Sequence, residues 1–175
     1  MKTRIALFTL LAASGLLAST PRLHAAQASP QTVTVTYDHP EHFTETREEK
    51  ALAPTRASND YLATLKTYME QRGAKMLAPG QHLDVVVTDI DRAGSFEPWR
   101  GGQMREVRII KDIYPPRIDL RFKLTGADGK VIREGTRKLR DPGFLASNTA
   151  PTNTDSLRFE KQLIDRWLRR GPDKL

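Results

Sequence analysis

Length, composition and charge narrow what this chain can be. It has 175 residues, no cysteine and a formal net charge of +7. A chain without cysteine forms no disulfide and lacks the thiol that carries the diacyl anchor of a bacterial lipoprotein. Three basic residues lie in the first 28 positions, and the remaining charge of +4 is too small to predict nucleic-acid binding, which normally needs basic clusters on one face.

The first 28 residues have the pattern of a secretory signal peptide. A basic start precedes an uncharged run rich in Leu and Ala, residues 5–18. This run is shorter than the roughly 20 apolar residues that span a bilayer, so we expect a cleaved signal and no transmembrane anchor. Small residues predict cleavage after Ala28, with cleavage after Ala26 as the alternative. We therefore expect a periplasmic protein in which residues 29–175 form one domain.

The expected mature chain opens with a strand pattern. In residues 32–37 two valines and a tyrosine alternate with threonines, which is typical of a half-buried strand. Pro40 ends this pattern, because proline lacks the N–H that a sheet ladder needs. The polar residues 41–54 show no regular period, and we expect them to be irregular.

An amphipathic helix is predicted next. Ser58 is a candidate N-cap, and Gly73 stands where a glycine commonly follows the last turn of a helix. Between them, apolar residues recur at helical spacing: Tyr61, Leu62, Leu65, Tyr68 and Met69. The pattern predicts a helix that turns this stripe towards a core.

The middle of the chain is predicted to supply most of the sheet. Residues 83–90 are β-branched and mostly apolar, as in a central strand, and residues 107–111 are a candidate short strand. Apolar and charged residues alternate in 118–124. A Gly-Ala-Asp-Gly turn at 126–129 then leads into residues 131–139, which predicts an antiparallel hairpin.

A last helix is predicted near the end of the chain. Thr154 or Asp155 can cap it, and Gly171 with Pro172 stops it. Its apolar residues are Leu157, Phe159, Leu163, Ile164, Trp167 and Leu168. This order of elements predicts an α+β fold, a two-layer sandwich in which a mostly antiparallel sheet of four or five strands packs against two helices. The strand order stays open.

Three blocks of sequence are distinctive: VTVTYDHPEHFTE, VRIIKDIYPPRIDLRFKLTGADGKVIREGTRKLRD and SLRFEKQLIDRWL. Together they resemble a bacterial envelope family catalogued as domain of unknown function 3016. The likeness covers nearly all of residues 31–170, and the middle block is its most specific part. The resemblance implies a short exported protein of unassigned activity, and it supplies no catalytic or binding residues.

The sequence shows no catalytic constellation. It has no cysteine nucleophile and no Gly-x-Ser-x-Gly elbow, and the glycine pair at 101–102 is too short to cradle a phosphate. Asp84, Asp89 and Asp91 form a candidate carboxylate cluster, but pairing of the last two with arginines such as Arg92 is the simpler interpretation. We therefore predict no catalytic residue and no cofactor.

The loop 94–106 is the leading candidate for a binding site. It holds tryptophan and arginine, the residue types that dominate binding hot spots. With neighbouring residues, the candidate binding set is Phe96, Trp99, Arg100, Arg105, Tyr114 and Arg117. The alternative is that Phe96 and Trp99 fold back over the sheet edge as a satellite core. We expect a non-catalytic protein that binds an envelope protein or a glycolipid.

His39 and His42 carry a second hypothesis, a metal-binding protein or metal-dependent enzyme. Imidazole together with a carboxylate such as Glu41 or Glu45 is a ligand set that zinc, copper and nickel accept. Pro40 lies between the histidines and argues against a helix that would point both rings the same way. The alternative is a solvated turn that holds no metal.

Overall fold

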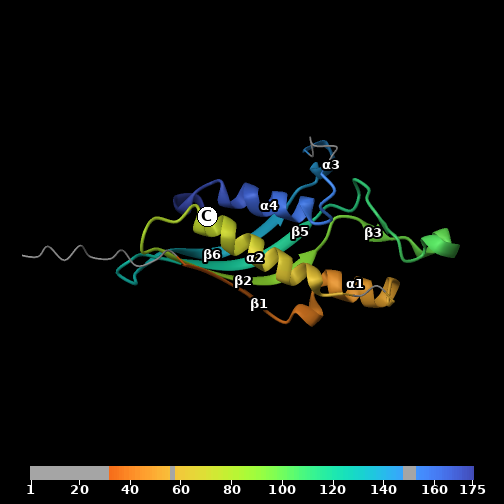
Figure 1. Cartoon of the computed structure of the whole chain (residues 1–175), viewed down its shortest axis with the longest axis horizontal. Coiled ribbons are helices and arrows are strands. Elements are labelled where there is room, and N and C mark those ends of the chain that lie inside the picture. Colours follow the sequence, from red (N-terminus) through yellow and green to blue (C-terminus); the bar gives the residue numbers. More distant parts are fainter. Residues whose placement is uncertain (1–31, 56–57, 148–152) are drawn as a thin grey trace, which may run out of the picture.

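The computed structural model describes residues 32–55, 58–147 and 153–175, so the predicted signal segment 1–28 lies outside the described residues. A four-stranded sheet lies under two helices, α2 and α4 (Figure 1). This arrangement confirms the predicted α+β sandwich. None of the helices in the described part of the chain has the length and apolar character needed to cross a membrane.

The sheet is mixed, with the strand order β1-β2-β5-β6. The strands are β1 (Thr32–Tyr37), β2 (His82–Asp91), β5 (Arg117–Thr125) and β6 (Val131–Arg140). β1 and β2 are parallel because helix α2 (Asp60–Ala74) carries the chain back between them, whereas the other neighbours pair antiparallel. The predicted hairpin is therefore present as β5 and β6.

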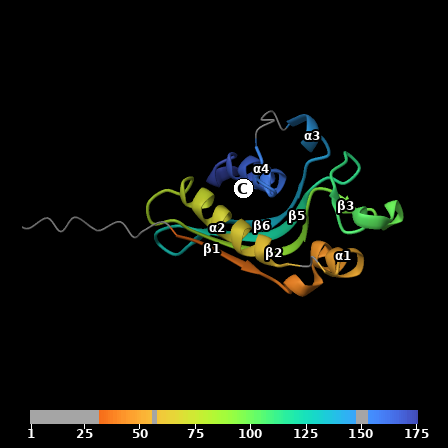
Figure 2. The ribbon, with the colours of Figure 1, turned by 45° about the vertical axis from the view of Figure 1, so that its right-hand side comes forward.

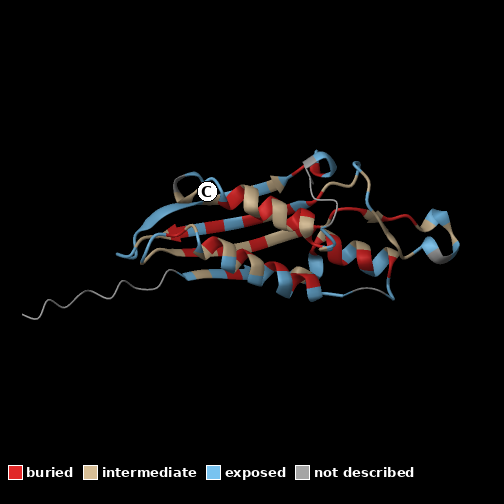
Figure 3. Ribbon diagram, turned by 45° about the horizontal axis from the view of Figure 1, so that its top comes forward, coloured by how far each residue is buried: buried red, intermediate tan, exposed pale blue. Residues whose placement is uncertain are grey.

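The core lies between one face of the sheet and the two helices. Side chains alternate along the strands, so that Val35, Val85 and Leu120 are buried while the residues between them face outwards (Figure 3). Helix α4 (Arg158–Leu168) places Trp167 edge-on against Phe122, with ring centroids 6.0 Å apart. The apolar stripes predicted from the sequence thus face the core.

Gly73 does not follow helix α2 as predicted; it lies inside the helix and is buried. A Cβ at this position would lie 3.1 Å from Cγ2 of Val33 in β1. The glycine therefore lets the helix approach the edge strand closely. At the other end, the Ser58 hydroxyl accepts a hydrogen bond from the Asp60 N–H at 3.1 Å, and Asn59 takes the N-cap position.

The expectation that residues 41–54 are irregular is wrong. A 3₁₀ turn, η1 (Pro40–His42), leads into helix α1 (Thr44–Leu52). Its buried residues are polar, namely Glu45, Thr46 and Glu49, so the helix has no apolar stripe for sequence analysis to find. Asp89 of β2 accepts the backbone N–H of Thr44 at 2.7 Å and its hydroxyl at 2.9 Å, which anchors the start of α1.

Residues 94–114, which we call the arm, leave the sheet between β2 and β5. Strand β3 (Ser95–Phe96) pairs antiparallel with β4 (Arg108–Ile109), and two 3₁₀ turns, η2 (Pro98–Arg100) and η3 (Gly102–Met104), lie between them. The arm projects from the same end of the molecule as α1, in two views (Figures 1 and 2). The short strand expected at 107–111 is present as β4. The remaining short elements are α3 (Phe144–Ser147) and η4 (Pro172–Lys174).

Candidate functional site

The base of the arm is fastened to helix α1 by a buried ion pair. Arg108 in β4 donates from Nη2 to the carboxylate of Glu45, which is fully buried, and from Nη1 to the Gly94 carbonyl at 2.9 Å. Its guanidinium also lies 4.6 Å from the ring centre of Phe96 in β3. The backbone N–H of Arg92 donates to the second Glu45 oxygen at 3.0 Å. The end of β2, the returning arm strand β4 and α1 therefore meet at one carboxylate.

Two further glutamates complete this cluster. Glu49 Oε1 lies 3.6 Å from a guanidinium nitrogen of Arg92 and at the same distance from one of Arg108, while Glu160 of α4 accepts the Ala93 N–H at 2.7 Å. Burial raises the pKa of Glu45 to about 7, although Arg108 and Arg92 oppose the shift. Burial raises the pKa of Glu160 as well.

These carboxylates with raised pKa are not accessible to a substrate. Glu45 and Glu160 are both sealed from solvent, whereas a general acid or base must reach the group it protonates. Two pockets of about 360 and 380 Å³ flank the cluster; Asp91, Ser95 and Arg117 help line the first, and Phe96, Arg108 and Arg158 the second. Neither pocket is lined by Glu45 or Glu160. The geometry therefore gives Glu45 and Glu160 a structural role, whereas Glu49 helps line the second pocket.

The middle of the arm is organised around Glu97, which is buried. Its carboxylate accepts from Nε of Arg100, from Nζ of Lys111 and, at 3.2 Å, from the hydroxyl of Tyr114. The hydrogen bonds from Lys111 and Arg100 lower the pKa of Glu97 to about 2. One charged carboxylate thus joins the outgoing and returning halves of the arm.

The outer surface of the arm carries bulky apolar side chains beside the exposed charged residues Arg100, Arg105 and Asp112. Trp99 is 72% exposed and Ile113 is 65% exposed, and Met104 and Ile110 are exposed to a smaller degree. The exposed large hydrophobic residues among those the structure describes number seven, and four of them belong to the arm. Burial colouring shows the exposed η2 and η3 turns at the far end of the molecule (Figure 3). The arm therefore presents bulky apolar side chains on a braced backbone.

The structure separates the two residues that the sequence treated as one aromatic pair. Phe96 is buried beneath Arg108, so it supports the arm and does not offer a contact surface; it is buried as the alternative expected, but against a guanidinium rather than in an apolar cluster. Trp99 lies outside the core.

The other four predicted residues take different places. Arg105 is exposed on the arm, whereas Arg100 and Tyr114 both bond to Glu97. Arg117, at the start of β5, donates from Nε to Asp91 at 2.8 Å. It belongs to the base of the arm and not to its outer surface.

Sequence reasoning missed the residues that hold the arm. Nothing in the pattern around Glu97 distinguishes it from a solvated glutamate, and Glu45 lies in a stretch without apolar period. Ile113 could have been noticed, because it is a large apolar residue directly after Lys111 and Asp112 in a segment that two prolines end.

The three aspartates of the candidate carboxylate cluster each contact a different partner. Asp84 Oδ1 lies 2.7 Å from Nε2 of His82, and Asp89 caps α1 through Thr44. Asp91 pairs with Arg117. Its partner is therefore an arginine, as expected, but it is not the adjacent Arg92.

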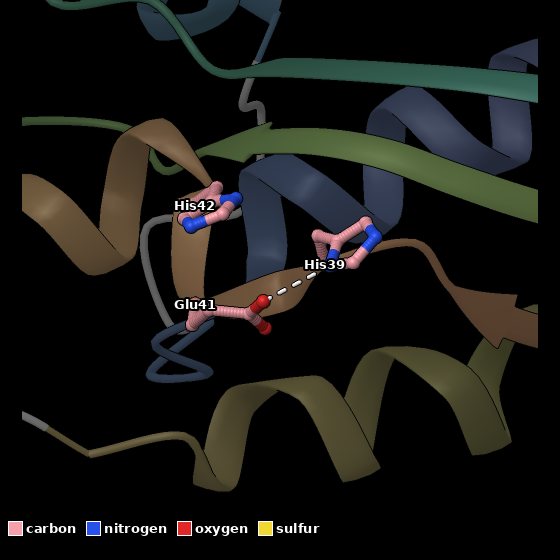
Figure 4. Close-up of side chains that lie close together, drawn as sticks. All are labelled: His39, Glu41 and His42. Atoms are coloured by element: carbon pink, nitrogen blue, oxygen red, sulfur yellow. Dashed lines mark hydrogen bonds and ion pairs between the residues drawn. The ribbon is translucent and has the colours of Figure 1, made fainter.

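The turn before α1 brings the predicted histidines together. The rings of His39 and His42 stack with centroids 5.7 Å apart and an interplanar angle of 21° (Figure 4). The expectation that Pro40 keeps the rings from facing the same way is wrong, because the 3₁₀ turn places them side by side. Glu41 lies next to both, whereas Glu45 is buried below the arm and takes no part.

Comparison with known proteins gives one match. A family model described as "Protein of unknown function (DUF3016)" matches residues 31–170. No significant match exists among the curated proteins or the solved structures. Since the matched range covers most of the 175 residues, this chain belongs to the DUF3016 family of proteins of unknown function.

Proposed function

We propose that this protein is a non-catalytic periplasmic module that binds another protein of the cell envelope through its arm. The observation that carries the proposal is the exposure of Trp99 on a backbone that Glu97 and Glu45 brace from within. Covering a large aromatic side chain costs less conformational entropy when its backbone is already fixed than when it lies on a flexible loop. The arm is thus pre-organised for binding.

The charges of the arm favour a protein partner over a glycolipid. Arg100 and Lys111 share the carboxylate of Glu97, and Arg108 pairs with Glu45. Anionic headgroups attract clusters of unpaired basic residues, which the outer surface of the arm does not offer. Its exposed tryptophan, isoleucines and methionine fit the apolar centre of a protein interface instead.

The periplasmic part of the proposal rests on the leader pattern of residues 1–28. Intact-mass measurement of the protein recovered from its native host tests it. We expect a species that begins at Ser29, or at Gln27 if cleavage follows Ala26. A species that still begins at Met1 in the cytosolic fraction would contradict export.

A cross-linking experiment tests the arm. Because the chain has no cysteine, the substitution Met104→Cys supplies the only thiol, to which a photo-reactive maleimide can be attached. Ile132→Cys is the matched control: Ile132 is an exposed apolar residue of β6, next to the hairpin turn at the other end of the sheet. Illumination with envelope extract is expected to give one discrete adduct from the arm and none from the hairpin.

The substitution Trp99→Ala in the Met104→Cys background completes the test. Loss of a hot-spot tryptophan costs about 2 kcal/mol or more, so the protein concentration needed for half-maximal adduct should rise about 30-fold. Equal adducts from arm and hairpin, or an adduct insensitive to Trp99→Ala, would refute the arm as binding site. If the protein instead sediments with lipopolysaccharide vesicles, and this sedimentation is lost in Trp99→Ala, the partner is a glycolipid and not a protein.

A further inference from the structure

Three side chains with metal-binding atoms lie on the turn between β1 and α1. The donor atoms of His39, Glu41 and His42 all lie within 4.8 Å of one another. Nδ1 of His39 lies 3.1 Å from Oε1 of Glu41, and the close-up shows that carboxylate directed at the His39 ring (Figure 4). All three side chains are exposed, so each can rotate towards a shared ion.

The backbone of this turn is held in an unfavourable conformation. His39 has φ 55° and ψ 59°, and it is the one non-glycine residue at positive φ within the described ranges. Such a conformation costs energy and persists only where the surroundings impose it, which occurs often at binding sites. Here the His39 ring stacks on that of His42, with the ring centroids 5.7 Å apart.

Contacts with the body keep the turn rigid. The Asp38 N–H donates to the Val87 carbonyl at 2.9 Å before the turn, and Phe43 is buried after it. The hydroxyl of Thr46 in α1 donates to the Pro40 carbonyl at 2.8 Å, and the His42 N–H donates to the His39 carbonyl at 2.9 Å. The ligands therefore stand on a fixed base, and binding would need side-chain rotation alone.

A second carboxylate lies behind His39. Oδ1 of Asp38 is 3.9 Å from Nε2 of His39, on the side of the ring away from Glu41, and Arg121 of β5 holds the other Asp38 oxygen at 2.9 Å. Histidine ligands of metals commonly donate their second ring N–H to a carboxylate, which orients the ring. Binding through Nδ1 of His39 would leave Nε2–H for Asp38. The present separation is longer than a hydrogen bond, so the His39 ring would turn towards Asp38 when the metal binds.

We propose that His39, Glu41 and His42 bind one divalent transition-metal ion, Zn²⁺ or Cu²⁺. Two imidazoles and a carboxylate suit these ions, whereas Ca²⁺ and Mg²⁺ prefer ligand sets made of oxygen alone. Ligand atoms of a tetrahedral Zn²⁺ site lie about 3.3 Å apart, so the observed separations require a modest closure by exposed side chains. The fourth position is open to water. The site lies outside the arm and is independent of the proposed partner binding.

Equilibrium dialysis of the protein without a histidine tag, followed by elemental analysis, tests the site. The probes are ZnSO₄ and CuSO₄, with MgCl₂ for comparison. We expect one equivalent of Zn²⁺ or Cu²⁺ and none of Mg²⁺. His42→Ala and Glu41→Ala should each weaken binding by at least about tenfold, the loss that removal of even an outer partner produces.

His82→Ala is the matched control, because His82 also lies beside a carboxylate, 2.7 Å from Asp84, but outside the turn. It should leave the stoichiometry and affinity unchanged. His39→Gly separates binding from folding: glycine accepts positive φ, so the melting temperature should be retained while metal binding is lost. Absence of a stoichiometric ion, or equal losses in His82→Ala and His42→Ala, would overturn the proposal.

Discussion

Arg108 of the arm and Glu45 of helix α1 form a buried ion pair across 63 positions of sequence. The Glu45 carboxylate is fully buried, and the Arg108 side chain is nearly so. A buried charge left without its partner is strongly destabilising. This contact therefore couples the position of the arm to the integrity of the domain.

The first prediction concerns that pair. Arg108→Ala leaves the Glu45 carboxylate buried with less compensation, and we expect a loss of about 3 kcal/mol in the free energy of unfolding. The measurement is urea denaturation at pH 8, where Glu45 of the parent protein is mostly ionised and the variant must either bury an unpaired carboxylate or take up a proton. Lys130→Ala is the control: Lys130 pairs with Asp128 on the exposed hairpin turn, and its loss should cost less than about 1 kcal/mol. Equal effects of the two substitutions would contradict a structural role for the buried pair.

The second prediction is a pH dependence of stability. Burial raises the pKa of Glu45 to about 7 from an ordinary value of 4.5, so the folded protein holds this proton more tightly than the unfolded chain. The contribution to stability is fully present below pH 4.5 and is lost as the pH rises through about 7. The free energy of unfolding should fall from pH 5 to pH 8. Glu45→Gln, which cannot ionise, should flatten that slope; an unchanged slope would exclude Glu45 as its source.

The third prediction has the opposite sign and concerns the arm. Hydrogen bonds from Lys111 and Arg100 lower the pKa of Glu97 to about 2, so its contribution is present above pH 4.5 and is lost as the pH falls towards 2. Acid should therefore loosen the arm. In a Trp167→Phe background, where Trp99 is the remaining tryptophan, its fluorescence anisotropy should drop over this range.

Glu97→Gln should reproduce that loosening at neutral pH. The variant keeps Trp99 and every exposed residue of the arm, so weaker partner binding by this protein would follow from lost bracing alone. An anisotropy at pH 7 equal to that of the parent would show that other contacts hold the arm.

The fourth prediction tests the close approach of α2 to β1. Gly73→Ala improves helix propensity by about 1 kcal/mol but places a Cβ 3.1 Å from Cγ2 of Val33. Overpacking of this kind costs roughly 1–3 kcal/mol, so we expect a net destabilisation of about 1 kcal/mol. In a Val33→Ala background the clash is absent, and Gly73→Ala should stabilise. Thermal unfolding of the parent, the two single variants and the double variant measures the coupling between the two positions. Additive effects of the two substitutions would contradict a clash between them.

The sequence predicted the sheet and both core helices well because their signal is local. Alternation in residues 118–124 and the stripe from Tyr61 to Met69 follow directly from the geometry of strands and helices. It also located the exposed Trp99 in a loop. It could not decide between exposure and burial for Phe96, because that depends on Arg108, which approaches from the returning strand.

The tertiary structure decided three features: helix α1, the bracing of the arm and the pairing of the histidines. Each depends on a polar partner far away in sequence: Asp89 caps Thr44, Arg108 neutralises Glu45, and the strained His39 turn is held from β2 and α1. Burial of an apolar face requires a periodic pattern of apolar residues in the sequence. The sequence around a charged residue, in contrast, does not indicate which opposite charge it pairs with. The sequence by itself therefore determined the sheet and the two helices that cover it. Only the tertiary structure decided how helix α1, the arm and the histidine turn are attached to them.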